Sequence, residues 1–251
     1  MCSKTRNGFT LIELLIAMAI TSIVMTAIVS VYHIQIKGKR TQEVLTDMNQ
    51  TARAAQEIMI NEIRMAGCDP AGNSNARIIE ADAMELVFSL DIDNDAGANQ
   101  ADGDCCDPNE VIRYQLTNDA DNDGINDNIA NVVQCDLGRE TGAGNDPQSA
   151  CGGAGVNGLQ AVARNVDALN FVYLDSDGNV LSTPVADPDD IRRIELTLVA
   201  RAGEVSGGLL FSYANTNTYQ NQQDDVILPP QNDSFRRLLL TTTVNLRNIG
   251  R

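Results

Sequence analysis

The chain has 251 residues, of which 43% are apolar, and its 34 acidic side chains against 18 basic ones give a formal net charge of -16. This length is sufficient for one sizeable hydrophobic core. A strongly negative protein repels the phosphate backbone, so a nucleic-acid partner is not expected. The short basic stretches Lys37–Arg40 and Arg192–Arg193 are too small to change this expectation.

The six cysteines, at positions 2, 68, 105, 106, 135 and 151, form no CxxC pair, and the chain has a single histidine, His33. This spacing disfavours a Cys/His zinc site. Cysteines placed in Gly- and Asp-rich sequence instead favour disulfides in an oxidising compartment. Loop-closure distance alone makes Cys135 with Cys151 the preferred pair, while other pairings and unpaired loop cysteines stay open.

The amino terminus begins with a short polar segment and continues as a long apolar one. Lys4 and Arg6 precede an apolar run that starts at Phe9, which places the amino terminus on the cytoplasmic side. The stretch 14–34 is long enough to span a bilayer. The small residue Gly8 precedes the apolar run, whereas a secretory signal has its cleavage site after it. We therefore expect cleavage at Gly8 to leave the membrane anchor attached.

Glu13 is a carboxylate inside this apolar run. A charge at membrane depth costs about 2.5–3.5 kcal/mol, so a partner is expected for it. The alternative is an ordinary membrane anchor in which Glu13 lies near the lipid headgroups.

The segment Gly8-Phe9-Thr10-Leu11-Ile12-Glu13 resembles the processing motif of type IV prepilins and of type II secretion pseudopilins. The resemblance implies that a prepilin peptidase cuts after Gly8 and methylates the new amino terminus at Phe9. It also implies that Glu13 pairs with the amino terminus of an adjacent subunit, where two opposite charges buried together are less costly than either alone. Other pilins, the peptidase and the inner membrane are then the expected partners.

The apolar run continues into an amphipathic pattern between Lys37 and Ala66, with apolar residues at steps of three and four. Gly67 and Pro70 indicate the end of the helix, so one helix is predicted from Phe9 to Ala66, with a bend allowed at Gly38. The stretch Glu62–Gly67 resembles the helix end of PilW-type minor pilins. An apolar stripe on the second half of this helix is expected to pack on a globular domain.

Beyond the helix the apolar period changes to two, which predicts strands. The fold class is therefore α+β, with a long N-terminal helix packed on a mainly antiparallel sheet. The expected divisions are a leader at 1–8, a membrane and filament-core helix at 9–36, an amphipathic helix at 37–67 and a β-rich globular domain at 68–251. The Asp-Gly sequence near 177 predicts a tight turn after one of the strands. The predicted strands are Met84–Leu90, Glu110–Leu116, Ala130–Cys135, Ala168–Leu174, Ile191–Arg201, Leu209–Tyr213 and Leu238–Arg247.

An acidic segment within this domain has the spacing of a calcium-binding loop. Carboxylates occupy loop positions 1, 3, 5 and 9, a glycine occupies position 6, and the carbonyl of position 7 is a further ligand. Ala130 stands where a bidentate acid closes an EF-hand, so the last ligand is expected from elsewhere, for example from Asp91, Asp102 or Asp104. The alternative is a solvated acidic loop. The predicted calcium ligands are Asp119, Asp121, Asp123, Ile125 and Asp127.

No catalytic motif is present, and paired carboxylates arise by chance in so acidic a sequence, so an enzyme is not expected. The sequence favours a minor pilin of a type IV pilus that takes part in pilus assembly or initiation, with tip display or adhesion as a further role. The alternatives are a type II secretion minor pseudopilin, a major pilin, or a calcium-stabilised adhesin on a pilin stem. The prepilin is expected in the inner membrane and the mature chain in an extracellular pilus or a periplasmic filament.

Overall fold

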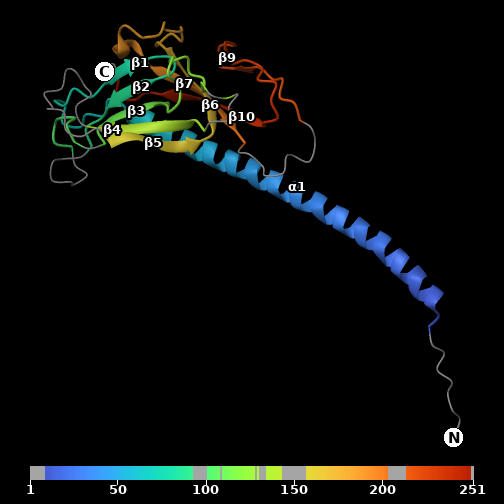
Figure 1. Ribbon diagram of the computed structural model, residues 1–251. Coiled ribbons are helices and arrows are strands. Elements are labelled where there is room, and N and C mark those ends of the chain that lie inside the picture. Colours follow the sequence, from blue (N-terminus) through green and yellow to red (C-terminus); the bar gives the residue numbers. More distant parts are fainter. Residues whose placement is uncertain are drawn as a thin grey trace. The chain divides into compact units, whose positions relative to one another are not determined.

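The structure is a computed structural model that describes residues 9–92, 101–107, 109–127, 129, 134–142, 157–202 and 213–249. Contacts divide these residues into two compact units, with the boundary inside the long helix between Val44 and Leu45. We call residues 9–44 the stem and the described residues from 45 to 249 the head. The fold class is α+β, as predicted, with one long helix and antiparallel sheets (Figure 1).

Helix α1 runs from Leu11 to Met65 and is continuous through Gly38. The prediction of one helix from 9 to 66 is confirmed to within two residues at each end. The helix ends at Met65 and Gly67 lies in the turn that follows, as predicted; there the backbone has a positive φ of 72° and the amide donates to the Ser89 carbonyl at 2.9 Å. A Cβ at Gly67 would lie 2.4 Å from Cδ1 of Ile249, so the end of the chain packs against this turn.

Within the head, the second half of α1 buries one face, because its apolar residues recur at steps of three and four. The polar Glu62 of this half binds the first sheet: its carboxylate accepts from Nε of Arg139 at 2.9 Å and from the hydroxyl of Tyr114. The predicted packing of the amphipathic half on the sheets is therefore confirmed. The buried face consists of Met48, Ala52, Ala55, Met59 and Ile63.

The first sheet is an antiparallel meander in the order β1-β2-β3-β4-β5. β2 is wholly buried, and in β3 buried and half-buried residues largely alternate, because one face of the sheet lies on the core. They are β1 Ile78–Ala81, β2 Leu86–Ser89, β3 Val111–Leu116, β4 Asp136–Gly142 and β5 Asn157–Arg164.

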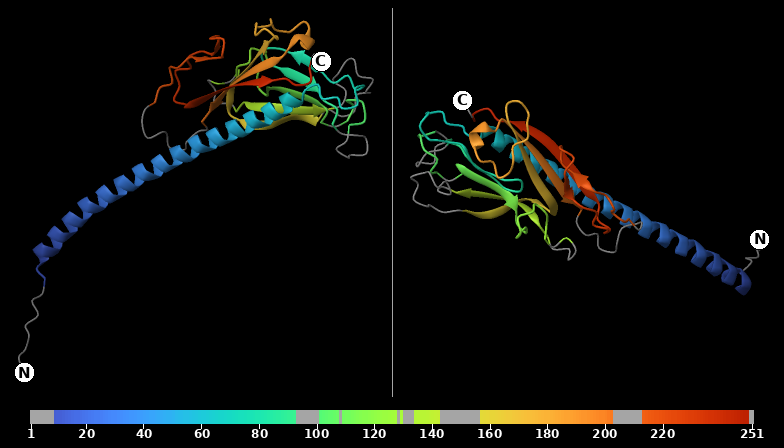
Figure 2. Two further views of the ribbon diagram at one scale, coloured as in Figure 1. Left: turned by 180° about the vertical axis from the view of Figure 1, so that it is seen from behind. Right: turned by 90° about the horizontal axis from the view of Figure 1, so that it is seen from above.

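The second sheet has the order β10-β7-β6 and is also antiparallel (Figure 2). β6 spans Val166–Leu174, β7 spans Arg193–Arg201 and β10 spans Arg237–Asn245. After β6 the predicted tight turn is present at Gly178, but the returning chain makes only one bridge, between Leu174 and Val180.

A short hairpin covers the outer face of the second sheet. It consists of β8 Tyr219–Gln220 and β9 Val226–Leu228. Its buried side chains pack with Ala168 and Val199, which are partners across β6 and β7. Strand β7 is consequently buried on both faces. The loop that carries the predicted calcium ligands joins the opposite edge of β6, where Ile125 forms an antiparallel bridge with Ala168.

The strand predictions succeeded where the apolar period was clear. The predicted strands at 84–90, 110–116, 168–174, 191–201 and 238–247 correspond to β2, β3, β6, β7 and β10. The predicted strand Ala130–Cys135 is wrong at Gln134 and Cys135, which precede β4, and residues 130–133 lie outside the described residues. Of the predicted strand Leu209–Tyr213, only Tyr213 is described, and it is not in a strand.

Candidate functional site: the exposed apolar stem and the acidic loop

The first turn of α1 is closed by its own side chains. Thr10, which precedes the helix, donates its amide and its hydroxyl to Oε2 of Glu13, both at 2.8 Å, and the amide of Glu13 donates to the Thr10 hydroxyl at 3.3 Å. This is a capping box, in which each of the two residues satisfies a backbone amide of the other. Glu13 therefore starts the helix through Oε2, and its second oxygen, Oε1, is left for another partner.

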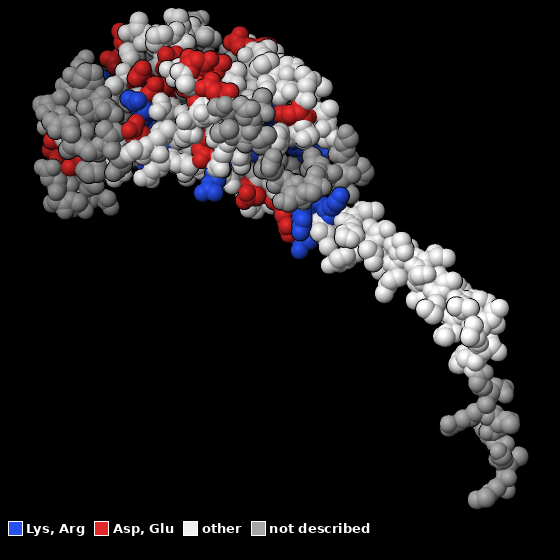
Figure 3. Space-filling model, in the orientation of Figure 1, with Lys and Arg blue, Asp and Glu red and all other residues white. Residues whose placement is uncertain are grey.

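The stem presents its apolar side chains to its surroundings. Every residue from 9 to 35 is exposed, and Phe9 and Ile23 have exposed fractions of 93% and 72%. Helix α1 is long and apolar enough to cross a membrane. On the face shown in Figure 3, acidic and basic atoms lie on the second half of α1 and on the head. Residues 9–35 thus form an apolar surface that the described residues leave exposed.

The few hydroxyl groups in the stem do not conflict with a lipid environment. Thr21, Thr26 and Ser30 each donate to the carbonyl four residues earlier, at 2.7–2.8 Å, and Ser22 donates to Ala19 at 2.9 Å. In a bilayer core every polar group must find its partner within the protein. These four hydroxyls meet this condition within the helix itself.

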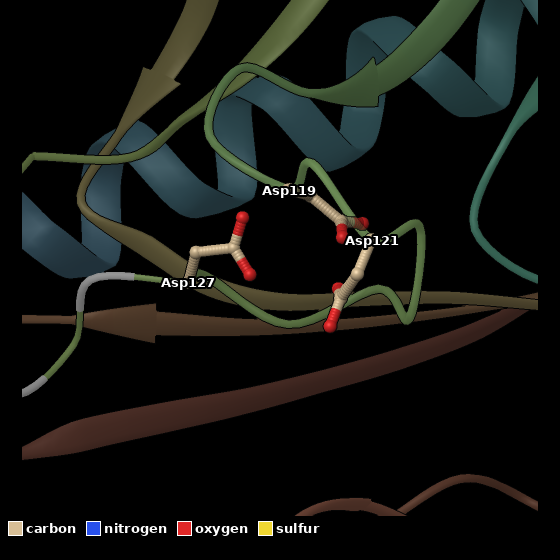
Figure 4. A group of neighbouring side chains, drawn as sticks. All are labelled: Asp119, Asp121 and Asp127. Carbon is tan, nitrogen blue, oxygen red and sulfur yellow. The ribbon is translucent and has the colours of Figure 1, made fainter.

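In the head, three of the five predicted calcium ligands come together. Carboxylate oxygens of Asp119, Asp121 and Asp127 lie within 4.8 Å of one another (Figure 4). The loop is held in shape by backbone bonds, since the Asp119 carboxylate accepts the amides of Asp123 and Gly124 at 3.0 and 2.9 Å. The three carboxylates could hold a metal ion between them.

The other two predicted ligands lie outside this triad. One oxygen of Asp123 accepts the amide of Ile125 at 2.8 Å, and Asp123 also lines a neighbouring cavity. Ile125 is paired with β6 through the carbonyl of Gly124 and the amide of Asn126, so its own carbonyl takes no part in this pairing. The structure therefore supports a smaller set of carboxylate ligands than the sequence spacing predicted.

The acidic loop is electrostatically unfavourable as it stands. Partial burial raises the pKa of Asp119 and of Asp123, and neighbouring carboxylates raise both further, against the amide bonds that lower them. A cation would remove this mutual repulsion. The proposed supplementary ligand Asp91 has a different role: it is buried, and its carboxylate accepts the amides of Asp102 and Gly103 at 3.2 Å.

The cysteine prediction is wrong for the preferred pair. Cys135 is a buried free thiol, so the expected Cys135–Cys151 disulfide is not formed; Cys151 lies outside the described residues. Cys135 lies just before β4, where its sulfur contacts the Asn118 carbonyl at 3.9 Å, and Cys68 and Cys105 are also free. Cys106 is disulfide-bonded. Separation along the chain was a poor guide because it ignores which side chains face the core.

Comparison with known proteins supports the reading of the amino terminus. Residues 3–29 match the prokaryotic N-terminal methylation motif, and this match contains Gly8, Phe9 and Glu13. The motif implies processing by a prepilin peptidase and assembly with other pilins. The match covers the start of the chain alone and says nothing of the head.

No curated protein matches the chain significantly. Among solved structures, a type IV-like pilin from Thermus thermophilus is similar over 81% of this chain and 98% of that chain, with 15% sequence identity and a TM-score of 0.48. The architecture described above is established by its own helix and strands and not by this likeness.

Sequence reasoning did not identify Thr10 as a functional residue. The signal was present, because Thr10 and Glu13 have the Thr-x-x-Glu spacing of a capping box directly before an apolar run. Glu13 was considered only as a charge in need of a partner. The structure adds that the same carboxylate determines where the helix begins.

Proposed function

We propose that this chain is a filament subunit, a minor pilin of a type IV pilus that is processed after Gly8, methylated at Phe9 and takes part in pilus assembly. The observation that carries the proposal is the exposed apolar stem, which begins inside the methylation motif and continues as one helix into the head. Such a surface is stable in lipid before assembly and against like helices afterwards, because lipid tails and apolar side chains are similarly apolar surroundings. The prepilin then resides in the inner membrane and the mature chain in the pilus.

The minor role is supported by the size of the head. Two sheets and an additional hairpin exceed what burial of one face of α1 requires. The same motif and helix also suit a type II secretion pseudopilin or a major pilin. Abundance in purified filaments distinguishes a minor from a major subunit. A filament at the cell surface indicates a type IV pilus, and a filament in the periplasm indicates type II secretion.

The first prediction concerns processing. Gly8→Val should abolish cleavage, because a branched side chain replaces the smallest residue at the scissile position of the motif. Mass spectrometry of the purified chain should find a methylated Phe9 terminus in the wild type and an intact Met1 terminus in the variant. Asn7→Ala is the matched control and should be cleaved normally. Identical uncut masses in the wild type and in Gly8→Val would refute processing.

We further propose that the triad of Asp119, Asp121 and Asp127 binds calcium, completed by the Ile125 carbonyl. Oxygen ligands supplied by an acidic loop suit Ca²⁺, and extracellular sites of this kind bind at about 10⁻⁴–10⁻³ M. The support is the convergence of three carboxylates in a loop that backbone bonds hold together.

The second prediction tests this site. Calorimetric titration of the full-length chain in detergent micelles should show saturable calcium binding, weakened at least tenfold in Asp121→Asn. Asp177→Asn, an exposed acid in the turn after β6, is the control and should bind calcium as the wild type does. Absence of heat at millimolar calcium, or equal loss in the two variants, would contradict the proposal.

A further inference from the structure

A cavity of about 230 Å³ lies on the outer face of β6, next to the acidic loop. Its floor includes Asn170 and Val172, and its walls come from the acidic loop, from the chain after the β6 turn and from the β8–β9 hairpin. All of these segments belong to the head. The cavity is small for a drug-sized ligand but sufficient for a single side chain or a short aliphatic molecule.

The side-chain amides of the cavity are bonded to each other and to the backbone. Asn170 donates to the Ala83 carbonyl at 3.3 Å and accepts from Nδ2 of Asn221 at 3.1 Å. The side-chain oxygen of Asn221 accepts the amides of Gln223 and Asp225, each at 2.9 Å. These bonds hold the two side chains at the floor of the cavity in place.

The cavity is lined by two exposed carboxylates, Asp123 and Asp225, each with one oxygen that has no partner among the described residues. Asp123 uses one oxygen for the amide of Ile125 at 2.8 Å, and Asp225 uses one for Nδ2 of Asn221 at 3.4 Å. Within the described part of the chain, Oδ2 of Asp123 and Oδ1 of Asp225 have no hydrogen-bond partner, and no Lys or Arg lines the cavity. A ligand that supplies donors and positive charge would satisfy both oxygens.

The same cavity has aliphatic walls that are open to solvent. Val180 and Val226, which lie on different walls, have exposed fractions of 53% and 55%. Covering apolar surface of this kind is favourable at about 25 cal/mol per Å². A suitable ligand therefore combines an aliphatic chain with a cationic, donor-only end.

We propose that this cavity binds a primary alkylammonium group, the group that ends a lysine side chain, with the ammonium between Asp123 and Asp225 and the methylenes against Val180 and Val226. An ammonium offers three donors and no acceptor, which matches the unused carboxylate oxygens. Its methylene stem packs on apolar surface while the charged end meets acidic oxygens. The proposal assigns Asp123 to this cavity and is independent of the function proposed for the stem.

The test is a titration of full-length protein in detergent micelles with valine methyl groups isotopically labelled, in calcium-free buffer, followed by nuclear magnetic resonance. Added n-butylammonium should give saturable shifts of the Val180 and Val226 methyl signals. n-Butanol, which has the same chain without the charge, should bind at least tenfold more weakly. Shifts that do not saturate, or that are equal for the alcohol, would overturn the proposal.

Variants locate the binding. Asp123→Asn with Asp225→Asn should weaken n-butylammonium at least tenfold, whereas Asp224→Asn removes an adjacent exposed charge and should leave affinity within about twofold. Asp121→Asn, in the metal triad, should also have little effect. Unshifted signals of the buried Val199 and Val244 show that each variant is folded. Unaltered affinity in the double variant would overturn the proposal.

Two further ligands identify the source of the ammonium. An Nα-acetyl-lysine amide represents a lysine on a protein surface, and 1,4-diaminobutane represents a free amine. The ligand that binds more tightly indicates whether the natural ligand is a protein lysine or a free amine. Failure of both, while n-butylammonium binds, would overturn the assignment to a biological alkylammonium.

Discussion

The two halves of helix α1 have the same backbone conformation but opposite surroundings. From 9 to 35 the apolar side chains occur on all sides and are exposed, whereas from Leu45 onward most of them occur on one face and that face is buried. A stripe can be covered by one sheet, but a helix that is apolar all round requires neighbours on every side. The period of the apolar residues, more than their number, therefore determines which half folds into the head.

This difference has an energetic consequence. A large apolar side chain gains about 1.5–3 kcal/mol when it is buried instead of exposed to water. In the isolated chain the stem does not gain this free energy. It gains it only when lipid or other stems cover its apolar side chains. The head is stabilised internally. Changes in the stem should thus affect assembly and changes in the head should affect unfolding.

The largest effect is expected from Glu13→Gln. Glutamine at this position preserves the capping box, because it also reaches the amide of the residue before the helix, but it removes the charge. If the free oxygen Oε1 pairs with the amino terminus of a neighbouring subunit, the variant should be processed normally and should enter filaments at least tenfold less. Quantitative mass spectrometry of sheared filaments and membranes measures both quantities.

Thr10→Val is the matched control, because it removes the hydroxyl that bonds to Glu13 and keeps the charge. Weaker capping costs about 1 kcal/mol at the helix start, so incorporation should fall little. Equal incorporation of Glu13→Gln and wild type would contradict a role for the Glu13 charge in assembly, since the stem would then assemble by apolar contact alone.

The next largest effect is expected in the head, at a buried ionic network. Arg237, at the start of β10, contacts Oδ2 of Asp167 at 2.6 Å and also binds Asp233, and both Arg237 and Asp167 have fully buried side chains. Arg237→Met should lower the free energy of unfolding by about 3–5 kcal/mol, because it leaves a buried carboxylate with less compensation. Urea unfolding of the full chain in micelles, followed by circular dichroism, measures this change.

Arg113→Met provides the comparison, since Arg113 binds Glu85 at 3.1 Å with a more exposed side chain and should cost about 1 kcal/mol or less. Adding Asp167→Asn to Arg237→Met should recover part of the loss by removing the unpaired charge. A cost for Arg237→Met no greater than for Arg113→Met would show that the network does not stabilise the head.

The sequence predicted local features well and distant pairings poorly. The helix, its end at Gly67 and the five strands with clear apolar alternation follow from neighbours in the chain. Asp167 was missed as a network residue, although a carboxylate at the start of the buried strand β6 is an unusual feature, because its partner Arg237 lies 70 residues further along the chain. No local pattern identifies such a partner.

Strand β4 shows how a local signal can mislead. Its sequence contains two glycines and three charged residues, a composition typical of a loop. Gly138 is in fact required by packing across the strand pair, because a Cβ there would lie 2.3 Å from Cγ of Leu159 in β5. The pairing with β3 and β5, and not intrinsic propensity, makes this segment a strand.

The acidic loop was predictable in part for a related reason. Spacing placed carboxylates around one centre, and three of them do converge there. It did not predict the direction of Asp123, because that depends on the bridge between Ile125 and Ala168, which is far away in sequence. The cavity beside the loop, built from five separate segments, had no signal in the sequence.

The smallest effect is expected from Cys105, and it applies to the head alone. The thiol is 3% exposed, its sulfur lies 3.6 Å from the Ser74 carbonyl, and burial raises its pKa from 9.0 to about 11. Between these two pH values the folded chain holds a proton that the unfolded chain has released, so the free energy of unfolding falls as pH rises, by at most ~2.7 kcal/mol. The contribution is complete below pH 9 and is lost by about pH 11.

Other groups also titrate in this range, so the measurement is a difference between two chains. Urea unfolding of the wild type and of Cys105→Ala, at intervals from pH 8 to 11, should give a shallower decline in the variant, whatever its stability at pH 8. Parallel declines would mean that the thiol titrates alike in the folded and unfolded chains, and that the segment around Cys105 opens to water at high pH.

Because the stem contains no cysteine, filament incorporation measured below pH 9 should be the same for both chains. A loss of incorporation in Cys105→Ala at pH 8 would instead show that the head contributes directly to assembly, and the division of roles between the two halves of α1 would then have to be given up.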